Sequence, residues 1–155
     1  MFIGFKHINL IDVSSEKFTF GQRIFLGKID TTSSHKIIEQ VMSVLYGVKV
    51  KPWQYKSVYA HILDVLNKLN KWSEIEKALN YEPTAEEKQA GIKQITDKLQ
   101  DFATVDAIAK RMHISHDNAM KLPYAIVFQM LQSDLEHSKF ERRLSKVYEQ
   151  KYKRK

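Results

Sequence analysis

The chain contains no cysteine, only three prolines and only five glycines. The absence of cysteine excludes a disulfide scaffold, thiol catalysis and a thiolate metal site, and it suits a reducing compartment. No apolar run approaches the roughly 18 residues that a membrane span needs. Residues 1–10 lack the basic start and the small-residue cleavage site of a signal peptide. We therefore expect a folded protein inside the cell that has no membrane partner.

Motifs of the common enzyme classes are also missing. The glycines are scattered, so neither GxxxxGK[ST] nor GxGxxG occurs, and GxSxG is absent. The six histidines show no HExxH spacing. His113 and His116 flank a predicted turn, and a role in that turn is favoured over metal binding. We expect a non-enzymatic protein without catalytic residues, cofactor or metal.

The positive charge is concentrated at one end of the chain. The 155 residues carry a net charge of +7, and residues 141–155 hold seven basic residues against Glu141 and Glu149. The basic residues of this tail are Arg142, Arg143, Lys146, Lys151, Lys153, Arg154 and Lys155. Such a tail is typical of a solvated helix end, of an electrostatic anchor for an acidic protein, or of a nucleic-acid contact. These three interpretations stay open.

The N-terminal region combines strand-like and helical signals. Residues 2–13, FIGFKHINLIDV, are rich in aromatic and β-branched residues and predict one or two short strands. The following FTFGQRIFLGKI also has a strand-like composition. However, Thr19 and Gln22 have the spacing of a capping box, and apolar residues fall on one helical face. A short helix is therefore favoured over a strand.

Two longer helices are predicted next. DTTSSHKIIEQVMSVLYG has several N-cap candidates, apolar residues at helical spacing and Gly47 as a C-terminal stop. Pro52 suits the first turn of a second helix over about residues 53–69. The pattern then allows either a break near Asn70 or one helix continuing to Asn80.

The next unit begins at a second capping box. Thr84 and Glu87 have the required spacing and predict a helix that runs to about Leu99. Gly91 lies inside this pattern and weakens the helix by about 1 kcal/mol relative to alanine. We expect one continuous helix here.

Residues 104–127, TVDAIAKRMHISHDNAMKLPYAIV, have the outline of a helix-turn-helix. They predict short helices over 105–112 and 116–121, and Pro123 then allows a last long helix to begin. Pro123 limits the second helix to about six or seven residues, which is short for reading base edges. Asp117 lies near its N-terminus, where it would repel a phosphate.

A packing role is therefore favoured over DNA reading for this element. Its apolar residues are expected to close a small helical cluster over the last helix. They are Ile108, Met112, Ile114, Met120 and Leu122.

The predicted fold is mainly α, a bundle of about five to seven helices with a small N-terminal β element. Residues 1–80 form an N-terminal subdomain with the β element and a helical hairpin, and residues 81–155 form a C-terminal helical subdomain with the basic tail. A single continuous domain is the alternative, because the length suits one domain of roughly 100–200 residues.

Two apolar surfaces are candidates for partner binding. In the last helix, apolar residues between Tyr124 and Val147 are expected to form one continuous stripe that includes Leu144. The region around Trp53 mixes aromatics with lysines, which suits stacking on single-stranded bases or a protein interface, and the interface is favoured. The candidate partner-binding residues are Trp53, Tyr55, Tyr124, Phe128, Leu131, Leu135 and Phe140.

The order of segments resembles the small helical tail assembly chaperones of bacteriophages. FTFGQRIFLGKI followed by IIEQVMSVLYGV is similar to the opening helices of that group, and IAKRMHISHDNAMKLPYAIVFQML to its small helical hairpin and final helix. The resemblance implies a non-enzymatic assembly or virion protein that binds other phage proteins in an oligomer or larger assembly. It implies a location in the host cytoplasm during assembly, or in the virion.

The basic tail departs from this group, whose members are often acidic or near neutral, and favours a variant built into the particle. The runner-up function is nucleic-acid binding through the helix-turn-helix-like element and the tail.

Overall fold

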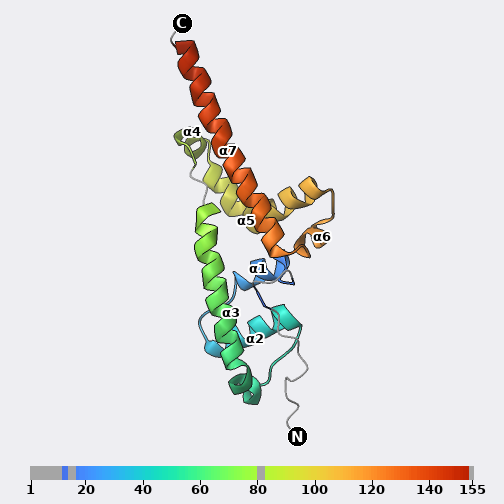
Figure 1. The fold of residues 1–155 in the computed structure, drawn as a ribbon. Coiled ribbons are helices and arrows are strands. Elements are labelled where there is room, and N and C mark those ends of the chain that lie inside the picture. The colour runs from blue at the N-terminus through green and yellow to red at the C-terminus, as the bar shows by residue number, and fades with distance from the viewer. Residues whose placement is uncertain (1–11, 14–16, 80–82, 154–155) are drawn as a thin grey trace.

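The computed structural model describes residues 12–13, 17–79 and 83–153, and these residues are mainly helical (Figure 1). Helices α1 (Phe20–Leu26), α2 (Ser34–Tyr46) and α3 (Tyr55–Glu76) gather toward one end of the molecule, and α7 (Tyr124–Lys153) runs away from them to the other end. Helices α5 (Ile92–Met112) and α6 (His116–Met120) lie toward the beginning of α7, and α4 (Ala85–Gln89) lies beside its middle. The described chain is therefore elongated, with α7 extending past the other elements.

The first two helices form where their caps predict them. Helix α1 spans Phe20–Leu26, and its capping box is complete, with the Thr19 hydroxyl accepting from the Gln22 backbone and the Gln22 side chain accepting from Thr19. Helix α2 spans Ser34–Tyr46 and ends at Gly47, which has φ of 65°. The prediction of a helix after Thr19 in place of a strand is confirmed.

The third helix, α3, is continuous through Asn70. The 3₁₀ turn η1 (Pro52–Gln54) has Pro52 in its first turn and leads into α3 (Tyr55–Glu76), which continues into the 3₁₀ turn η2 (Lys77–Leu79). No break occurs at Asn70. The buried residues of α3 are Val58, Ile62, Val65 and Leu69.

Gly91 divides the region that was expected to form one helix after Thr84. Helix α4 is short, Ala85–Gln89, and begins with the predicted capping box. Gly91 has φ of 84°, a left-handed conformation that glycine adopts without a steric penalty. Helix α5 then runs from Ile92 to Met112. The predictions of one helix to Leu99 and of a separate short helix over 105–112 were both wrong.

The turn into the last helix agrees with the prediction. His113 has φ of 53°, and α6 is a five-residue helix, His116–Met120, capped by Ser115. Helix α7 spans Tyr124–Lys153 and begins directly after Pro123.

The described residues form no β-strand. An isolated antiparallel bridge joins Thr19 to Pro123, where the Phe20 amide donates to the Leu122 carbonyl at 2.9 Å. The β element predicted for residues 2–13 lies outside the described residues, except for Asp12 and Val13, which belong to no strand. The all-α class is thus confirmed and the β element is not supported.

One hydrophobic cluster contains residues from both predicted subdomains. It includes Phe18, Met42 and Ile62 from the first and Ile108 and Val127 from the second, all at most 2% exposed. The last buried residue of α7 in this cluster is Val127, with Phe128, Met130 and Leu131 packed against it. The core therefore lies beside the first two turns of α7 and not along its whole length.

Candidate functional site

The predicted Trp53 surface is only partly open. Trp53 is 74% exposed, and the Lys51 ammonium lies over its ring at 5.0 Å from the centroid. Tyr55 turns instead toward α2, where it stacks on His35 with ring centroids 5.0 Å apart and donates a hydrogen bond to Glu39. Trp53 therefore remains available to a partner, whereas Tyr55 has contacts within the chain.

The first half of α7 packs against other helices of the same chain. Tyr124 is 5% exposed, and Trp72 contacts both Tyr124 and Phe128 edge-on, with ring centroids 5.0 and 5.5 Å apart. Leu131 is partly buried against the core, and Leu135 is half-buried. Of the candidate partner-binding residues in this half, Tyr124 lies in the core and presents no surface to a partner.

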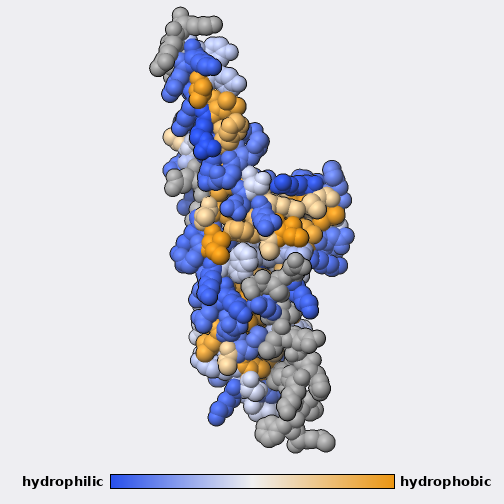
Figure 2. Space-filling view, viewed as in Figure 1, coloured by the Kyte–Doolittle hydropathy of each residue, from blue (hydrophilic) through white to orange (hydrophobic). Residues whose placement is uncertain are grey.

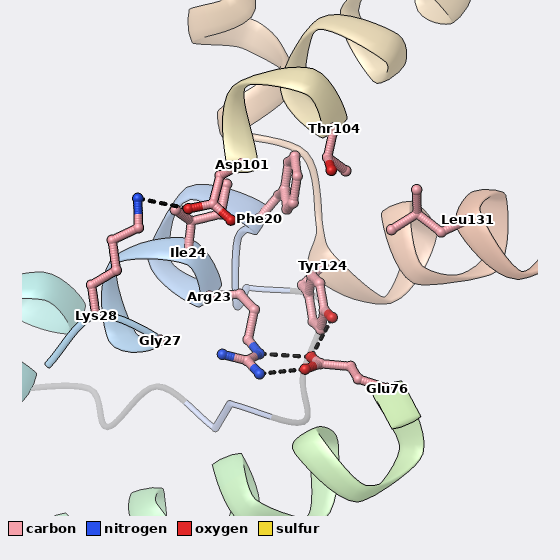
Figure 3. Close-up of a pocket in the computed structure, with 10 residues that line it drawn as sticks. All are labelled: Phe20, Arg23, Ile24, Gly27, Lys28, Glu76, Asp101, Thr104, Tyr124 and Leu131. Carbon is pink, nitrogen blue, oxygen red and sulfur yellow. Dashed lines mark hydrogen bonds and ion pairs between the residues drawn. The ribbon is translucent and has the colours of Figure 1, made fainter. Parts of the chain in front are cut away.

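A polar cluster holds α7 in place against α1 and α3 (Figure 3). The Arg23 guanidinium forms a two-pronged ion pair with Glu76, with its Nε 2.7 Å from Oε1, and the Tyr124 hydroxyl donates to the same carboxylate. Burial and the hydrogen bond to Glu76 raise the pKa of Tyr124. Burial lowers the pKa of Arg23, but Glu76 more than offsets this, so that the pKa is raised. Neither group changes its charge near neutral pH.

The cavity beside this cluster has a volume of about 320 Å³. Its wall contains the Arg23–Glu76 pair and a second ion pair in which the Lys28 ammonium lies 2.6 Å from Asp101. Thr104 and apolar side chains complete the lining. These charges are matched within the wall, and the cluster links α1, α3 and α7.

The second half of α7 has a different character from the first. We call residues 136–153 of α7 the arm and the remaining described residues the body. Figure 1 shows the end of the arm standing clear of the other helices. Figure 2 shows apolar side chains among the charged ones at this end. The large exposed apolar residues of the arm are Phe140, Leu144, Val147, Tyr148 and Tyr152, and they are between 37% and 77% exposed.

Of these side chains, Phe140, Leu144 and Val147 lie on the side of α7 opposite to the packed face. An α-helix turns by about 100° per residue, so the 20 positions between Tyr124 and Leu144 rotate the side chain by about 200°. Phe140, Leu144 and Val147 follow one another at steps of four and three and share one face. The predicted continuous stripe from Tyr124 to Val147 was therefore wrong, because it consists of two stripes on different faces.

The packed face continues into the arm as polar residues. Ser138, Arg142, Ser145 and Glu149 line an open groove between α7 and α4, together with Thr84 and Glu87. The Arg142 guanidinium lies 3.2 Å from the Glu87 carboxylate across this groove. Arg142 thus links the arm to α4.

The other basic residues of the tail differ in what they contact. Arg143, Lys146 and Lys151 are exposed, and Lys146 and Lys151 form no ion pair with any residue that the structure describes. Lys153 is the last residue of α7. Arg154 and Lys155 lie outside the described residues. The electrostatic role predicted for the basic residues of the tail, Arg142 included, stays a prediction.

The helix-turn-helix-like element packs inward and has no long second helix. Helix α6 has five residues, with Asp117 in its first turn, and its Ala119 is fully buried. Ile108 is buried, and Ile114, Met120 and Leu122 pack against the core as expected. Met112, which was predicted to join them, is 41% exposed. The element closes the helical core, as the packing interpretation predicts.

Among the described residues, no group of three histidine, aspartate or glutamate side chains is arranged to hold a metal ion. None of the described helices is both long and apolar enough to cross a bilayer.

Comparison with known proteins gives no match to any family model, curated protein or solved structure. The geometry of the arm is therefore the basis for any functional assignment. Sequence reasoning had included Phe140 as a contact residue but not Tyr148 and Tyr152. Tyr148 follows Leu144 by four positions, and this spacing would have identified it, whereas Tyr152 lies about 120° around the helix from Phe140.

Proposed function

We propose that this chain is a non-enzymatic assembly or structural protein of a tailed phage that acts by protein–protein contact, with the arm as its main contact surface. The observation that carries the proposal is the stripe of exposed apolar side chains on the arm, on the side turned away from the body. The order of helices resembling phage tail assembly chaperones supplies the setting. The protein then acts in the host cytoplasm during assembly, or within the virion.

The energetics of the stripe support a binding role. Burying a side chain such as Phe140, Leu144 or Val147 stabilises a complex by roughly 1.5–3 kcal/mol before the costs of association. Anchors spaced at i, i+4 and i+7 on one helix face are the arrangement by which a helix docks onto an apolar surface. Exposed Trp53, in the 3₁₀ turn η1 that leads into α3, is a second contact candidate.

The test is co-expression of the tagged full-length chain with the products of the genes on either side of its own gene. We expect the wild-type chain to recover a neighbouring product that is a tail or virion component. The double variant Leu144→Asp, Val147→Asp is expected to recover at least about tenfold less, because charges replace buried anchors.

The matched control is Ser145→Asp, which adds a negative charge on the side of the arm that lines the groove with α4, away from the stripe. It should recover the same product as the wild-type chain, and circular dichroism should show the same helix content in all variants. Equal recovery by the double variant would contradict the proposal, as would recovery of host transcription complexes alone.

Nucleic-acid binding remains the second candidate, supported by the exposed basic residues Arg143, Lys146 and Lys151. The short, inward-packed α6 no longer supports it. This function would make binding fall steeply with salt concentration, since each phosphate contact releases counterions. Apolar contacts through the stripe would survive moderate salt.

A further inference from the structure

We propose that the partner segment recognised by the arm is an acidic amphipathic helix that packs alongside it. This inference rests on the proposed function and specifies the chemistry of the partner. Two observations support it, namely the spacing of the residues on the exposed face and the excess of positive charge toward the end of the arm.

The exposed face of the arm has the spacing of a coiled-coil seam. His137, Phe140, Leu144, Val147 and Lys151 follow one another at alternating steps of three and four residues. This alternation keeps one seam facing a neighbouring helix over about two heptads. Leu144 and Val147 lie at its centre, and Lys151 occupies a seam position where a coiled coil usually has an apolar residue.

The charge of the arm specifies the partner. From Arg143 to Lys153 the arm has four basic residues and a single acidic one, Glu149. Lys151 lies in the seam and Arg143 at its edge, and both are exposed. Glutamates on a partner helix would pair with both groups, whereas a basic partner would place like charges together in a partly dehydrated seam.

A second copy of this chain fits less well than an acidic helix. Parallel arms would place Lys151 against Lys151. Antiparallel arms would place the basic end against residues 136–142, where Glu136 and Glu141 are balanced by Lys139 and Arg142. Glu136 already lies 2.8 Å from Lys139. The excess positive charge is thus left without compensation in both orientations.

The experiment measures binding of the full-length chain to two labelled synthetic peptides by fluorescence anisotropy, at about 0.15 M salt. Both peptides have about four heptads with isoleucine and leucine in the seam. One carries glutamate at the flanking positions and the other carries lysine. We expect the glutamate peptide to bind at least about tenfold more tightly than the lysine peptide.

Two double variants separate the contribution of the apolar residues to peptide binding from that of the charged residues. The double variant Leu144→Asp, Val147→Asp should lose at least about tenfold in affinity for the glutamate peptide. The double variant Arg143→Glu, Lys151→Glu keeps the apolar residues and should reverse the preference toward the lysine peptide. Ser145→Asp, on the side of the arm that lines the groove with α4, serves as the matched control and should retain the preference of the wild-type chain.

Several outcomes would overturn the inference. Equal binding of the two peptides, or no binding of either, contradicts it. So does an unchanged preference after the charge reversal. Tighter binding to vesicles containing phosphatidylglycerol, or self-association that the Leu144→Asp, Val147→Asp variant abolishes in sedimentation, would assign the face to a lipid surface or to a second copy.

Failure of the acidic-helix proposal can be distinguished from failure of the proposed function. If the stripe variant loses the neighbouring gene product while neither peptide binds, the arm is a contact surface with a partner of other chemistry. If capture of that product is unaffected by the stripe variant, the proposed function is wrong whatever the peptides do.

Discussion

At the scale of single residues, Tyr46 and His61 join α2 to α3 through one hydrogen bond. The Tyr46 hydroxyl and the His61 Nε2 lie 2.6 Å apart. Burial lowers the pKa of His61 below its ordinary value. The charge of Asp64 opposes this shift and that of Lys68 adds to it. The folded state therefore favours the neutral imidazole.

This pair predicts a dependence of stability on pH. The contribution of His61 is fully present above its unfolded pKa of about 6.5 and is lost as the pH falls through the lower folded pKa. Between pH 7.5 and pH 5.5, the Tm of the wild-type chain should fall more than that of His61→Gln, by a difference on the order of 1–3 °C. Thermal unfolding followed by circular dichroism measures this. His137→Gln on the exposed arm is the control and should behave as the wild type, and an equal fall in His61→Gln would contradict the assignment.

Whether the role of a single residue could be predicted depended on how far away in the sequence its partner lies. The caps at Thr19 and Thr84 and the turn at His113 were predictable, because a cap or a turn involves residues only a few positions apart. Glu76 pairs with Arg23, 53 positions away, and with Tyr124, 48 positions away. No local pattern carries information about such a pair, so the cluster was not predicted.

At the scale of secondary-structure elements, α1 and α6 approach each other closely at Gly21. A Cβ at this position would lie 3.0 Å from the Met120 carbonyl oxygen and 3.2 and 3.3 Å from atoms of the Met120 side chain. The carbonyl belongs to the backbone of α6 and cannot rotate away as a side chain does. The absence of a side chain at Gly21 is therefore what permits this helix contact.

Gly21→Ala should destabilise the fold although alanine favours helix formation by about 1 kcal/mol. We expect a net loss of about 1–2 kcal/mol in the free energy of unfolding, because α1 and α6 must separate. Urea unfolding measures the loss. Gly27→Ala is the matched control, since its closest neighbour is the Arg23 Nη1 at 3.2 Å, the far end of a flexible side chain. A loss in Gly27→Ala as large as that in Gly21→Ala would contradict this explanation.

Most helices were predictable, but their continuity was not. Hydrophobic periodicity and caps located α1, α2 and the starts of α3, α4 and α7. Periodicity does not decide whether Gly91 is tolerated in a helix or ends it, because tertiary packing decides between those states. In the same way, the apolar residues of α7 were read as one stripe, although their face changes after Leu135. Counting apolar residues ignores the angle between them around the helix axis.

At the scale of the whole molecule, the buried core and the exposed stripe use different parts of α7. The buried core ends at Val127, with Leu131 packed against it, whereas the exposed stripe begins at Phe140. The ion pair between Arg142 and Glu87 is a contact between partly exposed groups, and such pairs contribute about 0–1 kcal/mol. The arm therefore adds little to the stability of the body.

The body should consequently tolerate changes in the arm that abolish binding. We expect Leu144→Asp, Val147→Asp to change the free energy of unfolding by no more than about 0.5 kcal/mol. Val127→Asp, which places a carboxylate in the core, should cost at least about 3 kcal/mol or prevent folding. Differential scanning calorimetry of the three proteins measures the contrast. A large loss in the arm variant would mean that the stripe is part of the core.

The reversal of apolar face along α7 has an evolutionary consequence. Under the proposed function, selection on residues from Phe140 onward comes from the docked macromolecule and hardly at all from the requirement to stay folded. The protein could then acquire a new associate, or exchange one for another, through a handful of substitutions in a single terminal segment. Grafting this segment between divergent relatives should accordingly transfer their choice of associate while leaving the recipient scaffold intact.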